Sequence, residues 1–174
     1  MKIFILISLL LCFCSVAHEH KIHDSSKKSA NGVRKIVGPD LKSSLIEILK
    51  ADELLHESFF KYDAEAVEKN AKALATIVDS VKDKKIKKIF KKTSKQLLKI
   101  KASEEKDKNY HSYGLVSKTL VEILKKYDLG VDYNIYYCPM LKKSWVQNSK
   151  KKNKVHNPYA GDYMPHCGVK TTNF

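Results

Sequence analysis

Four apolar stripes at helical spacing constrain the fold of this chain more than any other feature. The second and third stripes repeat at intervals of four and three residues: Val67, Ala71, Leu74, Val78 and Val81, then Ile86, Phe90, Thr93, Leu97 and Ile100. Two further stripes cover residues 41–62 and 110–127. Such a period places the apolar side chains on one face of a helix, so four amphipathic helices sharing one core are expected.

The breaks between the stripes are short, and they fall near positions 62, 82 and 103. Asp63 is a suitable N-cap for the second helix, and Gly130 is expected to be a left-handed C-cap for the fourth. No strand pattern precedes Val131. We therefore predict an all-α fold, in which residues 39–130 form a monomeric, antiparallel four-helix bundle with up-down-up-down topology.

The C-terminal segment, residues 131–174, differs in character from the helical region. It holds three of the four prolines, and its first residues are β-prone and aromatic. Turn-forming residues then recur up to Gly168. We predict a small irregular Cys/Met knuckle packed on the bundle.

The first 17 residues have the pattern of an export signal. Lys2 precedes a short apolar run, and the small Ser15 and Ala17 occupy the positions that signal peptidase prefers. We predict cleavage near Ala17 and a periplasmic or otherwise exported protein whose residues 18–38 form a flexible N-terminus. A lipoprotein processed before Cys12 or Cys14 is the alternative.

Removal of this signal would leave four sulfur-bearing residues, all within a short C-terminal stretch. They are Cys138 and Met140 in one proline-containing turn, and Met164 and Cys167 in another. His166 lies in the second turn. Soft thiolate and thioether ligands select soft ions such as Cu(I), and thioether is a poor zinc ligand. The spacing predicts a copper site formed by these four residues together with His166.

Two cysteines in an exported protein also commonly oxidise to each other. A Cys138–Cys167 disulfide would stabilise the knuckle by roughly 3–4 kcal/mol through loop closure. The chain would then be a structural or interaction module that docks an envelope partner without metal. The sequence is compatible with both hypotheses.

A second metal hypothesis concerns the N-terminus of the processed chain. Cleavage after Ala17 would expose His18, with His20 at the third position and His23 nearby. A free amine followed by a histidine at position three can bind Cu(II) or Ni(II). The alternative is a polar tail whose histidines have no shared role.

The charge and motif content exclude several functions. The formal net charge is +14, yet Arg34 is the one arginine, which argues against arginine-based reading of nucleic acid. Lysines concentrate over residues 82–99, either as a solvated helix face or as a weak attraction for anionic membranes or an acidic partner. No phosphate loop, zinc-protease motif or nucleophile elbow is present, so we predict no enzymatic activity.

A set of cysteine, methionine, aromatic, proline and glycine residues in the C-terminal segment occurs in a specific order. They are Tyr137-Cys138-Pro139-Met140, Trp145, Asn157-Pro158-Tyr159, Gly161, Met164 and Cys167-Gly168. This order resembles the motif of a bacterial family known as domain of unknown function 3347, in which a helical region precedes such a segment. The resemblance covers about residues 40–170, and the motif carries nearly all of it.

The resemblance implies an exported protein of unassigned activity whose relatives accompany copper and silver efflux adaptor proteins. It therefore implies heavy-metal handling, a metal-efflux or envelope partner, and roles for Cys138, Met140, Met164 and Cys167. His166 lies outside the family pattern. A lysine run also replaces a more acidic stretch of the family, so the charge of any docking surface differs here.

Overall fold

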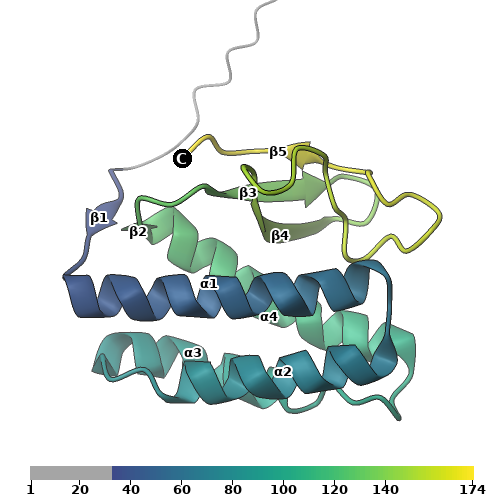
Figure 1. The fold of residues 1–174 in the computed structure, drawn as a ribbon, viewed down its shortest axis with the longest axis horizontal. Coiled ribbons are helices and arrows are strands. Elements are labelled where there is room, and N and C mark those ends of the chain that lie inside the picture. The colour runs from purple at the N-terminus through teal and green to yellow at the C-terminus, as the bar shows by residue number, and fades with distance from the viewer. Residues whose placement is uncertain (1–32) are drawn as a thin grey trace, which may run out of the picture.

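The computed structural model describes residues 33–174, and four helices make up most of it. Their bounds are Pro39–Phe60 (α1), Ala64–Asp79 (α2), Lys84–Leu97 (α3) and Lys106–Lys126 (α4). Successive helices pack side by side, so α2 lies between α1 and α3, and α3 lies next to α4 (Figure 1). The four predicted helices and the positions of their breaks are confirmed.

Local sequence explains where these helices begin. The Asp63 side chain accepts a hydrogen bond from the backbone N–H of Ala66 at 3.0 Å, as predicted, and satisfies a free donor in the first turn of α2. Asp83 caps α3 in the same way through the N–H of Ile86 at 2.9 Å. Gly38 precedes Pro39, whose fixed φ suits the first turn of α1.

Residues 33–174 also contain five strands, so the prediction of an all-α fold is wrong and this part of the chain is of mixed α and β type. The strands are Lys35–Ile36 (β1), Tyr127–Asp128 (β2), Tyr133–Cys138 (β3), Lys143–Asn148 (β4) and Val169–Lys170 (β5). β3 is the central strand of an antiparallel sheet of order β4-β3-β5. The knuckle is therefore an ordered sheet with loops, because its aromatic and β-branched residues find pairing partners.

β1 and β2 form a second, two-stranded parallel sheet that joins the start of the described chain to the end of α4. Arg34 reinforces this sheet through an ion pair with Asp128 at 3.1 Å. Part of the segment predicted to be flexible thus lies in a strand. The predicted C-cap role of Gly130 is also wrong, because α4 ends at Lys126 and Gly130, with φ +57°, lies in the turn between β2 and β3.

The sheet β4-β3-β5 covers α4 and the second half of α1 (Figure 1). Between these two helices, the rings of Phe59 and Tyr113 stack with centroids 4.5 Å apart. The buried Trp145 of β4 extends the same core. The helices and the sheet therefore share one hydrophobic core, and the knuckle does not fold as a separate unit.

The tail after Cys167 runs along β3 beyond the short β5. The backbone N–H of Thr171 donates to the carbonyl of Ile135 at 2.8 Å, and the N–H of Phe174 donates to the side chain of Asn134 at 2.8 Å. These bonds fix the last six residues on the sheet. Within residues 33–174, no helix combines the length and apolarity needed to cross a membrane.

Candidate metal site

Cys138 is the last residue of β3, and its side chain is fully buried. The chain turns directly after it and returns as β4, with Lys142 in the left-handed region at φ +52°. The turn leaves the backbone N–H groups of Met140 and Leu141 close enough to donate to the Cys138 sulfur. The Cys138 sulfur therefore lies at the end of β3, next to two backbone N–H donors.

Cys167 reaches the same place from the other end of the knuckle. Its backbone N–H donates to the carbonyl of Met164 at 3.0 Å, which closes the second sulfur-bearing turn. β5 then pairs with β3 so that Val169 lies opposite Tyr137. This register places the two cysteines side by side, with their Sγ atoms 2.9 Å apart.

The two cysteines are free thiols in this structure. Their separation exceeds the S–S bond length of about 2.05 Å, so the two thiols lie in close contact without a disulfide bond. The sequence hypothesis required the two turns to meet, and the structure brings together one sulfur from each of them.

Gly168 allows this close approach. A Cβ atom at this position would lie 2.8 Å from Cη2 of Trp145 and 3.2 Å from the carbonyl of Tyr137, and φ is +143°. Both the contact and the backbone conformation exclude a side chain without rearrangement. The glycine after Cys167 thus lets the second turn lie directly against the buried Trp145.

Asn157 is the main organiser of the loop that carries Cys167, and sequence analysis did not assign it a role. It is completely buried. Its Nδ2 donates to the carbonyl of Cys167 at 2.8 Å, and its Oδ1 accepts from the N–H of Tyr159 at 2.9 Å. Its own N–H donates to the carbonyl of Pro165 at 2.8 Å. Asn157 therefore links the turn at residues 157–159 to residues 165–167 of the same loop.

Tyr159 and Trp145 attach this loop to the rest of the molecule. The Tyr159 hydroxyl donates to Oγ of Ser117 on α4 at 2.8 Å. The indole N–H of Trp145 donates to Gln147, 3.4 Å away, and the Gln147 amide donates to the carbonyl of Lys154 at 2.7 Å. The motif residues between the two cysteines thus hold the sulfur pair in place.

The thiol pair is electrostatically asymmetric. Burial raises the pKa of Cys138, but hydrogen bonds from the Cys167 thiol, the N–H groups of Leu141 and Met140, and Asn157 outweigh it. The pKa of Cys138 therefore lies below its ordinary value. The hydrogen bond to Cys138 raises the pKa of Cys167, so Cys138 ionises first and Cys167 keeps the proton.

The remaining predicted ligands lie around this pair. The side chain of Met140 is 67% exposed, and Met164 is partly exposed at the start of the second turn. His166 is exposed, and its Nδ1 lies 2.6 Å from the carbonyl of Val155, which leaves Nε2 as its free nitrogen. Among residues 33–174, no three His, Cys, Asp or Glu side chains are arranged to hold a metal ion. The donors that the structure places in contact are the two cysteine sulfurs.

His18, His20 and His23, the proposed N-terminal site, and the export signal itself lie outside the described residues.

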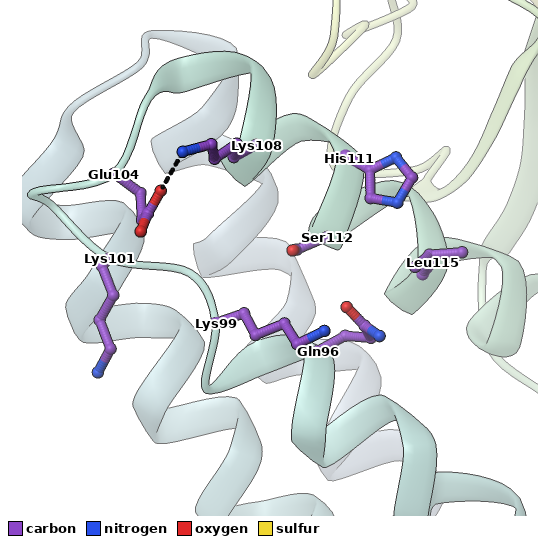
Figure 2. Close-up of a pocket in the computed structure, with 8 residues that line it drawn as sticks. All are labelled: Gln96, Lys99, Lys101, Glu104, Lys108, His111, Ser112 and Leu115. Carbon is purple, nitrogen blue, oxygen red and sulfur yellow. Dashed lines mark ion pairs between the residues drawn. The ribbon is translucent and has the colours of Figure 1, made fainter.

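A second candidate site is a groove of about 530 Å³ between the end of α3 and the first half of α4 (Figure 2). Positive and neutral polar groups dominate its lining: Lys99, Lys101, Lys108, His111, Gln96 and Ser112. Its one carboxylate, on Glu104, pairs with Lys108 at 3.3 Å. The chemistry of this groove suits an anion.

Comparisons with protein-family models, curated proteins and solved structures returned no match for this chain. The resemblance of the C-terminal motif to a known family stays a prediction.

Proposed function

We propose that this chain is a non-enzymatic, monomeric, exported protein that binds a soft metal ion, copper(I), through Cys138 and Cys167. The observation that carries the proposal is the 2.9 Å contact between their two sulfurs, which come from turns 29 residues apart. Two adjacent thiolates suffice to hold Cu(I), because this ion accepts two soft ligands. A metal-efflux or other envelope protein would be the partner that supplies or accepts the ion.

The protonation of the pair supports this proposal. A thiol must lose its proton before it binds a metal. Backbone and side-chain donors around Cys138 lower its pKa, so one of the two ligands loses its proton readily. Cys167 would lose its own proton if the pair held a metal ion, because a thiol must be deprotonated to serve as a ligand.

The two methionines complete the proposed site from the outside. Met140 follows Cys138 by two residues and is exposed, so it can contact an arriving ion before the buried sulfur does. Met164 shares a turn with Cys167. Thioethers bind soft ions without losing a proton, and they do not form disulfides. We assign the capture of the ion to the methionines and its retention to the cysteines.

A Cu(I) titration of the reduced protein against a competing chelator tests the proposal. The wild type is compared with a Cys138→Ser/Cys167→Ser variant and a Met140→Ala/Met164→Ala variant. We expect the cysteine variant to lose competition with the chelator and the methionine variant to keep part of it. Trp145, the only tryptophan, packs on Gly168 and reports binding through its fluorescence. Equal affinity of the wild type and the cysteine variant would refute the proposal.

A second candidate function is supported by the same sulfur contact. Oxidation of the two thiols would give a disulfide, and the chain would then be an interaction module that docks an envelope partner without metal. Counting free thiols on protein recovered from the periplasm separates the two functions. A disulfide that persists whether or not copper is supplied favours the interaction module, and free thiols that copper protects from alkylation favour metal binding.

A further inference from the structure

The exposed face of α3 carries a high density of positive charge. Nine lysines occur between positions 82 and 99, and all are exposed: Lys82, Lys84, Lys85, Lys87, Lys88, Lys91, Lys92, Lys95 and Lys99. Within residues 33–174, none of them takes part in an ion pair, whereas lysines elsewhere, such as Lys151 with Glu53, do. We call these nine residues the lysine face.

The nearby carboxylates are occupied by other groups. Asp79, at the end of α2, accepts a hydrogen bond from the hydroxyl of Ser94 at 3.0 Å. Asp83 caps the N-terminus of α3 through the N–H of Ile86. On α4, Glu122 pairs with Lys125 at 3.1 Å. These two aspartates offset only part of the charge of nine lysines, so most of the positive charge of the lysine face is left for a partner outside the molecule.

The packing of α3 fixes the direction in which this charge points. The buried stripe that includes Ile86, Phe90 and Leu97 binds the helix to α2 and α4. The lysines occupy the opposite side. Leu98, directly after α3, is 51% exposed beside them, and Ile89, 37% exposed, borders the side that faces α4. A lysine-rich surface with a few exposed apolar side chains matches an anionic lipid surface, where the charges meet headgroups and the apolar groups enter the interface.

The groove of Figure 2 continues the lysine face at its C-terminal end, because Lys99 belongs to both. Lys101 and Lys108 pair with Glu68 and Glu104, which leaves Lys99 as the lysine of the groove with no ion pair in the described chain. Gln96 and Ser112 line the groove beside it, as Figure 2 shows. This arrangement offers one cation and two neutral donors to a headgroup phosphate.

We propose that the lysine face docks this protein on an anionic phospholipid surface, with headgroup phosphates as its ligands. Lysine is a flexible point charge that suits a mobile array of phosphates, whereas reading of nucleic-acid bases favours the planar fork of arginine. The lysine face lies on α3, and the thiol pair lies at the ends of β3 and β5. Docking is therefore independent of metal binding.

Vesicle co-sedimentation of the full chain tests this proposal, with phosphatidylcholine vesicles that either contain or lack phosphatidylglycerol. A variant with Lys84, Lys88, Lys91 and Lys95 each changed to Gln removes four charges from the lysine face. A matched variant changes Lys50, Lys69, Lys118 and Lys154 to Gln, which are exposed lysines elsewhere without an ion pair in the described chain. Glutamine preserves helix propensity, and circular dichroism verifies that both variants fold.

We expect the wild type to sediment only with the phosphatidylglycerol vesicles and to dissociate as salt rises. The lysine-face variant should lose at least about tenfold in vesicle affinity, and the matched variant much less. Equal losses in the two variants would show a net-charge effect and overturn the proposal. It would also be overturned if the lysine-face variant lost binding to duplex DNA but kept vesicle binding. A Cys138→Ser/Cys167→Ser variant should bind the vesicles like the wild type.

Discussion

Asp52 and His56 lie one turn apart on the buried face of α1, and burial shifts their protonation in opposite directions. Burial raises the pKa of Asp52 to about 7, although a hydrogen bond from Tyr113 opposes the shift. Burial lowers the pKa of His56 to about 4. The uncharged His56 contacts the carbonyl of His156 through Nε2 at 3.0 Å, so this nitrogen carries the proton. The core thus favours the neutral form of both groups.

The first prediction concerns Asp52→Asn. The folded pKa of Asp52 lies above its ordinary value of 3.8, so its contribution to stability is fully present below that value and is lost as pH rises through about 7. The loss amounts to roughly 4 kcal/mol at most. We expect the variant to gain stability relative to the wild type as pH rises from about 4 to about 7, with little further gain above about pH 8, in urea unfolding. A constant difference across that range would contradict the assigned pKa.

The second prediction concerns His56→Gln and has the opposite sign. The folded pKa of His56 lies below its ordinary value of 6.5, so its contribution is present above that value and is lost as pH falls through about 4. The glutamine amide can still donate to the carbonyl of His156. We expect the variant to lose less stability than the wild type on acidification from about pH 7 to about pH 4, measured by thermal unfolding. Parallel acid-unfolding curves would count against a neutral buried histidine.

The third prediction uses the two glycines Gly168 and Gly38 as a matched pair. Gly168→Ala should destabilise the fold by roughly 1–3 kcal/mol, because the new Cβ meets Trp145 in a strained backbone conformation. Gly38→Ala should have little effect, because nothing lies within 4 Å of its Cβ position. Denaturant unfolding measures both changes. In Gly168→Ala, faster alkylation of Cys138 would show that the sulfur pair has opened.

The fourth prediction concerns Asn157→Ala. The change removes the donor to the carbonyl of Cys167 and the acceptor for the N–H of Tyr159, and it leaves buried polar groups unpaired. We expect a loss of roughly 2–4 kcal/mol in unfolding free energy. Asn153→Ala, at an exposed position in the same loop, is the control. Copper affinity should fall in Asn157→Ala and stay unchanged in Asn153→Ala. Equal copper affinities of the two variants would show that Asn157 does not position the thiol pair.

The fifth prediction tests the asymmetry of the thiol pair. Cys167→Ala removes the thiol that donates to Cys138, so the pKa of Cys138 should rise. Cys138→Ala removes the partner that raises the pKa of Cys167, so that pKa should fall. Ultraviolet absorption of the thiolate during a pH titration of the reduced variants measures both. Shifts of the same sign in the two variants would show that the pair is symmetric.

The helices of this protein are predictable from its sequence because their information is local. The apolar residues of a stripe, such as Val67, Ala71 and Leu74, follow one another at intervals of about one helical turn. Capping residues such as Asp63 act on the next three residues. The strands depend on distant partners. Lys35 pairs with Tyr127 across the whole helical region, and neither residue has a strand pattern around it. Two-residue strands of this kind exist only because the tertiary fold brings their backbones together.

The contact between the two cysteines was predictable, but the residues that build it were not. The clustering of sulfur identified Cys138 and Cys167, and the structure places these two in contact. Asn157 and Gly168 are part of the motif, but the sequence does not reveal what they do in the fold. Asn157 bonds to the backbone of Cys167, and Gly168 makes room for Trp145. The asparagine–proline step and the glycine after a cysteine were the available signals, and both are common in ordinary turns.

The residues that follow Cys167 hold it next to Cys138. Val169 and Lys170 pair with β3, and Thr171 bonds to Ile135, so the position of Cys167 depends on residues that contribute no sulfur. A protease that cleaved the chain after Gly168 would remove the strand pairing that positions Cys167, without cutting any helix. The lifetime of the thiol pair in the presence of proteases would then be set by the integrity of residues 169–174.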